Sequence, residues 1–346
     1  MKKWEPYAEF ANFILRFGDS LKLLDLAEEV VIPAFLNPGV VRTYGSTTYF
    51  LYQTQLTEIP FEGKSKLCLV GRFVKNTTLQ RNQIFDEEQG LIQDTQAMES
   101  APSSIFVLVL SNHKLLYFHE TPNAPDLSSF RATVELNISA VYEGYIRNTV
   151  AQRQEKALAE ARPGSRPPRV TLKSVRQELP RLSLEIIPLT NEDDFAAFLE
   201  RLSVLTNVRI ELVDPNDDTD NNSFFEQWRE NKDLLAAAKT ALNFHNQEGL
   251  NKEAAVVQLS AATEQGNSRI TLSGKDTGGN DVLVDNNKFR TRVSIPVIDD
   301  FVGTISRMYE AYQNFRQRGM NVDEDETTDA DAKVAAIQDR ANIGNG

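Results

Sequence analysis

Histidine, cysteine and clustered carboxylates are the side chains of this sequence whose types suit catalysis or metal binding. His113 and His119 lie six residues apart, next to Glu120, so on one continuous strand the two histidines would face the same side. A third ligand at metal-binding spacing is missing, and we interpret both as ordinary strand histidines. His245 ends an amphipathic stretch, where we expect it to interact with a helix C-terminal dipole. Cys68, inside KLCLVGRFV, is predicted to be a small buried hydrophobe.

The sequence contains no motif of a common nucleotide-binding or hydrolytic enzyme: no G-x-S-x-G elbow, Walker A loop or G-x-G-x-x-G fingerprint. Four aspartates cluster after the strand-like run NVRIELV: Asp214, Asp217, Asp218 and Asp220. A metal-dependent nuclease that uses this loop, residues 214–220, is one hypothesis. No catalytic lysine or glutamate accompanies the aspartates and their spacing differs from a calcium loop, so we favour a solvated loop. We therefore predict no catalytic residue, no metal, no cofactor and no enzymatic activity.

Residues 147–181 are far more basic than the rest of the chain. The stretch RNTVAQRQEKALAEARPGSRPPRVTLKSVRQELPR has seven Arg and two Lys against three Glu, which gives +6 in a chain whose net charge is −12. Its candidate nucleic-acid-binding residues are Arg147, Arg153, Lys156, Arg162, Arg166, Arg169, Lys173, Arg176 and Arg181. Neutralising duplex phosphates releases counterions whatever the base sequence, whereas the absence of aromatic residues argues against stacking on single strands. A mobile, solvated linker is the alternative, and both interpretations stay open.

Composition limits the class of protein. A chain of 346 residues is long enough for two domains, each with its own core. The longest apolar run, IFVLVL, is far too short to span a bilayer, and MKKWEPYAEF lacks the apolar stretch of a signal peptide. A single cysteine cannot form an internal disulfide, which agrees with a reducing compartment, so we expect a cytoplasmic protein.

The elements that would position these residues alternate between strands and helices, which predicts an α+β fold. Its two domains of mixed sheet meet at the basic, proline-containing segment, because PGSRPPR cannot be helical. The predicted boundaries are an N-terminal α+β domain (1–146), a basic interdomain segment (147–181), a C-terminal α+β domain (182–318) and a disordered acidic tail (319–346).

Within these domains the periodicity predicts particular elements. In the first, we expect an edge strand at residues 9–17, a helix at 20–37 and a hairpin of IFVLVL with KLLYFHE. In the second, the strand RLSLEIIPL, the helix EDDFAAFLERLS and the strand NVRIELVDP predict a βαβ unit with parallel strands. A helix is then expected at 223–246, strands at AAVVQLSA and SRITLSGKD, and a turn at TGGN. The apolar stripe of the last helix, at 297–318, is interpreted as core rather than a dimer seam.

Several stretches are similar to one known family and follow the same order along the chain: GSTTYFLYQTQL, PSSIFVLVLSNHKLLYFHETPNAPDLSSF, LSLEIIPLTNEDDFAAFLERL and SRITLSGKDTGGNDVLV. In these stretches the chain resembles the RexA family of the lambda phage exclusion system. The resemblance implies a homodimeric sensor that binds double-stranded DNA without sequence preference and is paired with a membrane effector protein encoded nearby. It supplies no catalytic residue.

Three hypotheses follow. The preferred one is a non-enzymatic, DNA-binding sensor or regulator in bacterial antiphage defence that acts through the basic segment. The second is the metal-dependent nuclease, and the third is an adaptor with no nucleic-acid role, whose acidic tail binds a basic partner.

Overall fold

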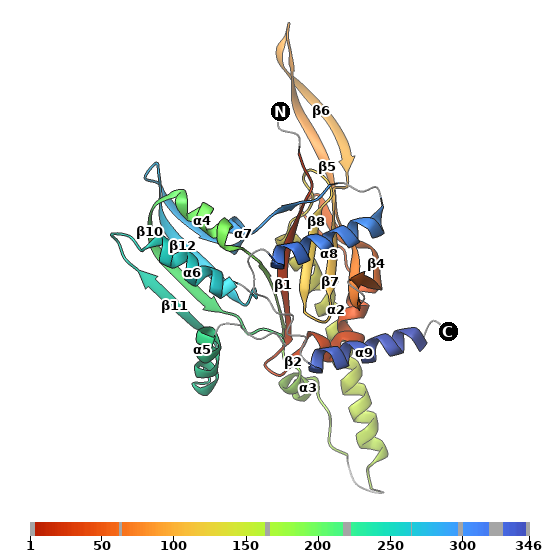
Figure 1. The fold of residues 1–346 in the computed structure, drawn as a ribbon. Coiled ribbons are helices and arrows are strands. Elements are labelled where there is room, and N and C mark those ends of the chain that lie inside the picture. The colour runs from red at the N-terminus through yellow and green to blue at the C-terminus, as the bar shows by residue number, and fades with distance from the viewer. Residues whose placement is uncertain are drawn as a thin grey trace.

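The computed structural model describes residues 4–61, 64–162, 167–216, 223–263, 265–296, 300–317 and 328–343. Two antiparallel sheets lie next to one another, and helices pack on both (Figure 1). The larger sheet has ten strands, in the order β14-β1-β8-β7-β5-β4-β3, with β2 and β9 paired to β1 and β6 paired to β5. The smaller sheet has the order β11-β10-β12-β13. The predicted α+β class is confirmed.

The strands of the larger sheet are β1 (Tyr7–Phe17), β2 (Leu21–Lys22), β3 (Arg42–Tyr44), β4 (Thr47–Phe61), β5 (Lys64–Asp86), β6 (Gly90–Ser100), β7 (Ser103–Val109), β8 (Lys114–His119), β9 (Leu182–Pro188) and β14 (Val293–Ser294). The prediction that β1 is an edge strand is wrong, because it pairs with β8, β9 and β14. Its side chains alternate between two cores, Phe13 on one face and Phe10 on the other, so the strand is apolar along most of its length. The hairpin of β7 and β8 agrees with the prediction.

Helices cover both faces of this sheet. One face carries η1 (Leu23–Leu26), η2 (Ala27–Val31), α1 (Ile32–Leu36), α2 (Leu127–Ala159), α3 (Leu172–Glu178) and α9 (Thr328–Ile343), and the other carries α8 (Phe301–Gln317). The helix expected at 20–37 is divided into 3₁₀, π and α turns, although the predicted apolar stripe is buried. The stripe of α8 is core, as predicted, since Ile305, Met308 and Tyr312 pack on the sheet.

The smaller sheet belongs to a unit formed by residues 191–289, which we call the inserted unit. Its elements are α4 (Glu192–Glu200), β10 (Leu202–Leu212), α5 (Ser223–Leu234), β11 (Thr240–His245), α6 (Lys252–Thr263), β12 (Ser268–Asp276), β13 (Asp281–Asp285) and α7 (Asn286–Phe289). The hairpin at TGGN is present. Two predictions are wrong here: the helix expected at 223–246 ends at Leu234 and is followed by a strand, and AAVVQLSA is helical in α6.

The domain boundary predicted at 147–181 is also wrong. β9 pairs with β1 over seven residues and β14 pairs with β1 again, so the chain leaves the larger sheet at residue 188 and returns to it at residue 293. Strands from both halves of the sequence thus form one sheet. The predicted βαβ unit does not form, because β9 and β10 lie in different sheets and β9 is antiparallel to its partner.

The acidic tail is ordered where the structure describes it, so the prediction of a disordered segment is wrong for residues 328–343. Ala330, Val334 and Ile337 recur at helical spacing and are buried in the core beside η1. Lys333 Nζ lies 2.8 Å from Asp25 Oδ1, which fixes α9 to the sheet unit. Residues 319–327 and 344–346 lie outside the described residues.

The Asp25–Lys333 contact predicts a pH-dependent docking of α9. Burial disfavours the charged form of Asp25, but hydrogen bonds from the Lys333 side chain and the Lys22 backbone N–H outweigh it and lower the carboxyl pKa below 3.8. A lowered folded-state pKa means that this stabilisation is present above about pH 4 and is lost as the pH falls through the folded pKa. At pH 7, Asp25→Asn should reduce the hydrogen-exchange protection of α9 about tenfold.

The matched control is Asp329→Asn, which removes a carboxylate that also contacts Lys333 but belongs to α9 itself. This control should leave the protection nearly unchanged. If Asp25→Asn and the parent chain differ as much below the lowered pKa as at pH 7, the carboxylate charge is not what holds α9.

Candidate nucleic-acid interface

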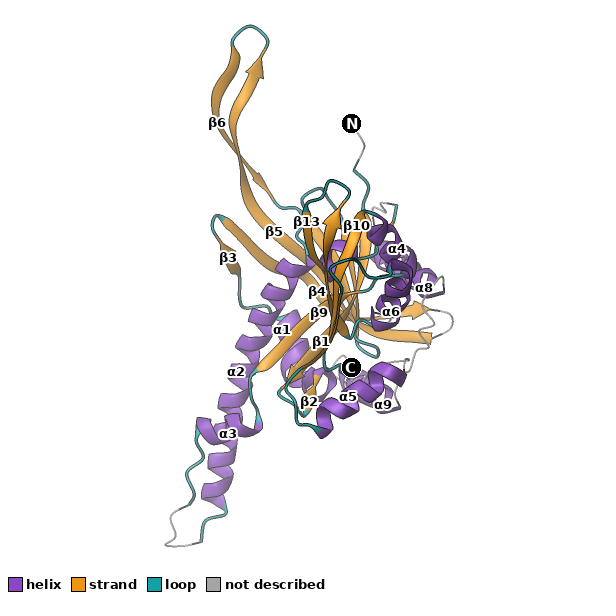
Figure 2. Ribbon diagram, turned by 90° about the vertical axis from the view of Figure 1, so that its left-hand side faces the viewer, coloured by secondary structure: helices purple, strands orange, loops and turns teal. Residues whose placement is uncertain are grey.

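The first half of the basic segment is the end of the long helix α2. The helix begins where the Asp126 side chain accepts a hydrogen bond from the Ser129 backbone N–H at 2.8 Å. Buried apolar residues recur along the helix as far as Ile146, although Leu136 is exposed, and the last turns of the helix project from the body of the molecule (Figure 2). Val150, Val175 and Leu179 still pack in or against the core, so it is the last turns of α2 that stand away from it.

The second half of the segment packs back along α2. Thr171 caps α3 by accepting a hydrogen bond from Ser174 N–H at 3.1 Å. The Tyr142 hydroxyl donates to the Pro180 carbonyl at 3.0 Å, and the Val170 N–H donates to Gln154 Oε1 at 2.8 Å. We call residues 143–162 and 167–181 together the α2–α3 arm. Over these residues the segment is a packed pair of helices and their connections, and not an extended linker.

Ion pairs hold part of the basic set within the arm. Arg176 lies 2.6 Å from Glu143 and Arg153 lies 2.7 Å from Glu178, so each joins α2 to the second half of the segment. Lys156 is 3.9 Å from Glu160, one helical turn away. These three basic residues are partly neutralised by local acids, which gives them a structural role. Glu143, which lies outside the predicted segment, could not have been identified from sequence spacing.

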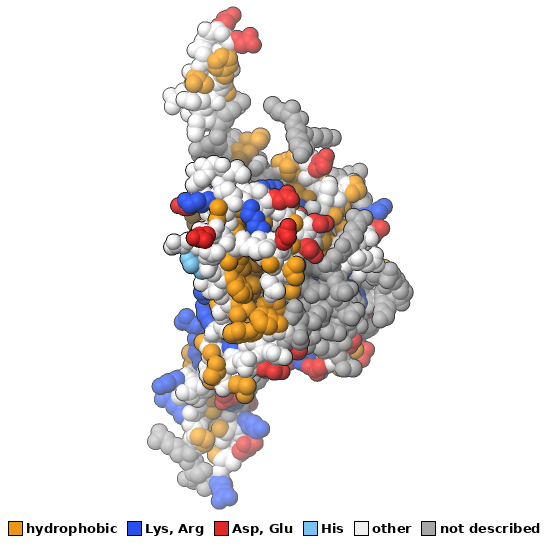
Figure 3. Space-filling view, turned by 60° about the vertical axis from the view of Figure 1, so that its left-hand side comes forward, with side chains coloured by type: hydrophobic (Ala, Val, Ile, Leu, Met, Phe, Trp, Pro, Cys, Tyr) orange, Lys and Arg blue, Asp and Glu red, His pale blue; other side chains and the backbone are white. Residues whose placement is uncertain are grey.

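The other basic residues face solvent. Arg147, Arg169, Lys173 and Arg181 are exposed and form no ion pair with a residue in the described ranges. Arg162 is also exposed, and Arg166 lies outside the described residues. Figure 3 shows blue Lys and Arg side chains along the lower projection, with red acidic side chains among them. The arm therefore presents positive charge on a rigid support, as contact with a phosphate backbone requires.

The residues considered first for catalysis do not assemble into a site. His113 lies in the turn before β8 and His119 lies at the far end of that strand. His245 is on β11, so the predicted helix-dipole interaction is wrong. Cys68 is fully buried in β5, as predicted, and burial raises the pKa of its thiol. Among the described residues, no three His, Cys, Asp or Glu side chains are grouped so that they could hold a metal ion.

The acidic loop is only partly described. Asp214 forms an ion pair with the buried Lys232 of α5, so its carboxylate has a structural contact. Asp217, Asp218 and Asp220 lie outside the described residues. The hypothesis of a metal-dependent nuclease at residues 214–220 therefore stays a prediction.

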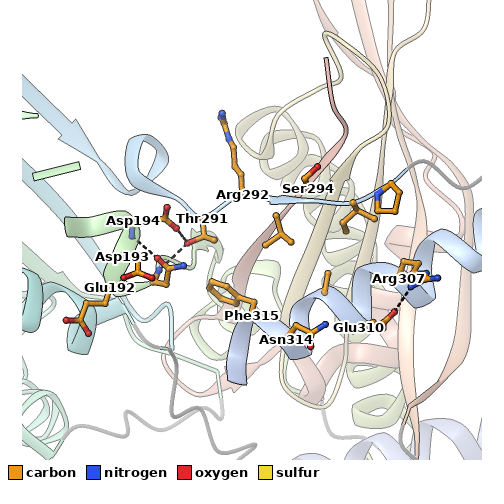
Figure 4. A pocket seen from close by; sticks show the side chains of 15 residues that line it. Glu192, Asp193, Asp194, Thr291, Arg292, Ser294, Arg307, Glu310, Asn314 and Phe315 are labelled. Carbon is orange, nitrogen blue, oxygen red and sulfur yellow. Dashed lines mark hydrogen bonds and ion pairs between the residues drawn. The ribbon is translucent and has the colours of Figure 1, made fainter. Parts of the chain in front are cut away.

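A polar cleft of about 700 Å³ lies between α4, residues 291–296 and α8 (Figure 4). Its polar groups are largely engaged with one another or with the fold. Thr291 donates a hydrogen bond to Asp194, and Arg307 lies 3.2 Å from Glu310. Arg292 lies 3.2 Å from Glu9 of β1. The cleft is thus a seam between the inserted unit and the larger sheet, and the α2–α3 arm is the stronger candidate for a binding surface.

The part of the chain that the structure describes has no helix whose length and apolar character would let it cross a bilayer. No protein-family model matches the sequence, and no curated protein matches it.

Proposed function

We propose that this protein binds double-stranded DNA without sequence preference through the α2–α3 arm, and that it is a non-enzymatic sensor or regulator in the cytoplasm. The observation that supports the proposal is the set of four exposed basic residues on the projecting arm, Arg147, Arg169, Lys173 and Arg181, none in an ion pair with a described residue. Their charge can reach phosphates that the acidic remainder of the chain would repel.

The resemblance to the RexA family extends this proposal to a biological setting. The protein would act in phage exclusion as a homodimer that responds to DNA and signals through a membrane effector encoded nearby. The arm suits a sensor of DNA as such, because contacts to phosphates carry no direct information about base sequence.

The direct test is a variant in which Arg147, Arg169, Lys173 and Arg181 are all replaced by Gln. We expect its affinity for a random-sequence duplex to fall at least tenfold near physiological salt. The slope of log affinity against log salt should become shallower by up to about four units, roughly one for each phosphate that the variant no longer neutralises. Fluorescence anisotropy over a salt series measures both quantities.

The control carries the same change in net charge on other surfaces: Arg209→Gln, Lys239→Gln, Lys275→Gln and Arg307→Gln. These four side chains are exposed and lie on the inserted unit and α8. The control should bind as the parent does. Equal loss in both variants would show that only net charge matters, and no loss in the arm variant would place any DNA contact elsewhere. Cleavage of the duplex with Mg²⁺, abolished by Asp217→Ala plus Asp218→Ala, would instead support the nuclease hypothesis.

A further inference from the structure

The longest strand of the sheet continues well beyond its neighbours. The first part of β5 pairs with both β4 and β7, whereas residues 77–86 pair only with β6. This two-stranded ribbon is about 30 Å long, since each residue adds about 3.3 Å. It stands away from the body at the end opposite the α2–α3 arm (Figures 1 and 2). We call residues 77–100 the β-arm.

One face of the β-arm is apolar at two places. Leu79 pairs across the ribbon with Met98, and Phe85 pairs with Leu91. Residues 79 and 85 are six positions apart on β5, and the extra residue of the bulge lies in β6, so both pairs share a face. Phe85 is 73% exposed, Leu91 69% and Met98 63%, which is unusual for such large side chains.

An isolated two-stranded ribbon is at best marginally stable in water, so a ribbon of this length with its apolar pairs exposed needs a covering surface. Within the described residues, the end of the β-arm packs against no other element of the chain (Figure 2). Because no described part of the chain covers these apolar pairs, a second molecule is the candidate for the covering surface.

The charges of the β-arm indicate which molecule this is. Glu87 and Glu88 are exposed at its tip, next to Asp86. Figure 3 shows red acidic side chains beside orange hydrophobic ones at the upper end of the molecule. Lys75 lies at the base, on the same face as Leu79 and Phe85 by strand alternation. Its side chain forms no ion pair with a described residue. Along this face the acidic tip, the pair of Phe85 with Leu91, the pair of Leu79 with Met98 and then Lys75, two residues before the β-arm, follow one another, with positions 81 and 83 between the two apolar pairs.

This pattern is self-complementary when two β-arms pack face to face in antiparallel orientation. A two-fold axis through residue 82 brings residue 85 of one copy opposite residue 79 of the other. Phe85 and Leu91 of each copy then cover Leu79 and Met98 of the other copy. The same axis places residues 87 and 88 of one copy opposite residues 77 and 76 of the other, next to its Lys75. A two-fold interface repeats each of these contacts twice.

We infer that the β-arm is a self-association surface, on which the β-arm of a second copy of this chain packs in antiparallel orientation. The apolar pairs of the two copies then contact one another, and the acidic tip of each copy lies next to Lys75 of the other. The α2–α3 arm lies at the other end of the molecule and stays open in such a dimer. The inference is therefore independent of DNA binding.

Removing the apolar contact is the first test. Phe85→Ser plus Leu91→Ser should weaken the dimer about 100-fold, because four large side chains lose their cover in each dimer. Sedimentation equilibrium over a concentration series measures the dissociation constant, and the melting temperature checks that the sheet unit is intact. Leu234→Ser plus Leu235→Ser is the matched control, since these leucines are 83% and 79% exposed on the inserted unit.

Two charge reversals test the orientation. Lys75→Glu alone, and Glu87→Lys plus Glu88→Lys alone, should each weaken self-association at least tenfold through like-charge contacts. Asp86 is left unchanged because its carboxylate accepts hydrogen bonds from the Glu88 and Gln89 backbone N–H groups in the turn. An equimolar mixture of the two variants should form a heterodimer as stable as the parent, because both of its charge contacts again join opposite signs. Native mass spectrometry distinguishes the heterodimer by mass.

The inference is overturned by a parent chain that stays monomeric at every concentration, or by a mixture that does not recover. It is also overturned if the β-arm variants associate normally while Phe244→Ser plus Val257→Ser dissociates the dimer. Phe244 lines an apolar groove between β11 and α6, and Val257 is an exposed residue of α6, so this second surface would then be the contact.

Discussion

Glu9→Ala is expected to lower the free energy of unfolding by about 3–5 kcal/mol, because it leaves a buried cation without its partner. Glu9 lies on β1 and is fully buried. Its Oε1 is 2.8 Å from Arg290 Nε and 3.2 Å from Arg292 Nε, and His119 Nε2 lies 3.7 Å away. Both arginines belong to the segment that returns from the inserted unit to β14. The carboxylate therefore joins the two ends of the sheet unit across about 280 residues of sequence.

The buried cation, and not the missing carboxylate, should account for most of this effect. The Arg290 side chain is only 14% exposed, whereas that of Arg292 is 52% exposed and can turn to water. The double variant Glu9→Ala plus Arg290→Met should therefore recover more than half of the loss, and Glu9→Ala plus Arg292→Met should recover little. Urea unfolding at pH 7 measures all four free energies. A loss below about 1 kcal/mol for Glu9→Ala would show that the cluster is open to solvent.

Elements whose apolar pattern and turn residues agree locally could be predicted from the sequence. The hairpin of β7 and β8 combines two apolar runs with a short polar turn, and β12 and β13 flank Gly278-Gly279. The apolar residues of α8 recur at helical spacing, and they are buried along one face of the helix. In each case the element can be identified from residues close together in sequence, by their periodicity or their turn, whichever surface the element later packs on.

The errors arose where distant residues decide the structure. β9 is an apolar strand whichever sheet it joins, and nothing within it indicates that β1, at the start of the chain, is its partner. Residues 254–261 are mostly apolar and include two adjacent valines, a composition that is also typical of a strand. The Asn251 side chain accepts a hydrogen bond from the Ala254 N–H at 3.0 Å, and Val256 and Leu259 are buried at helical spacing. That N-cap was a usable signal for the helix.

The order of the tail and the exposure of the basic residues likewise depend on residues distant in sequence. The acidic residues near the start of α9 are typical of disorder, yet negative charge also stabilises the N-terminus of a helix. Ala330, Val334 and Ile337 form an apolar stripe that becomes buried when it packs on the core. The nine basic residues were identified by composition alone. Which of them remain exposed depends on acids such as Glu143 and Glu178, whose approach is a property of the folded arm.

Gly266→Ala is expected to destabilise the protein by about 2–4 kcal/mol, although it adds a single methyl group. Gly266 connects α6 to β12 and has a φ of +72°, a conformation that disfavours any side chain. A Cβ at this position would lie 2.8 Å from Asn12 Cβ and 2.9 Å from Leu189 Cδ2, far inside contact distance. The neighbouring Asn267 accepts a hydrogen bond from the Asn12 side chain at 2.8 Å, so the crowded point lies in the contact between the inserted unit and the sheet.

A matched control separates the two causes of this effect. Gly279 has a φ of +83° in the β12–β13 turn, and a Cβ there would meet nothing within 4 Å. Gly279→Ala should therefore cost only about 1–2 kcal/mol, which is the contribution of the backbone conformation. The remainder in Gly266→Ala measures the crowding, and hydrogen exchange should show the extra opening at β1 and β9, whose residues Asn12 and Ile187 line the site. Equal losses in the two variants would mean that the inserted unit moves away at no cost, and that it is not held firmly against the sheet.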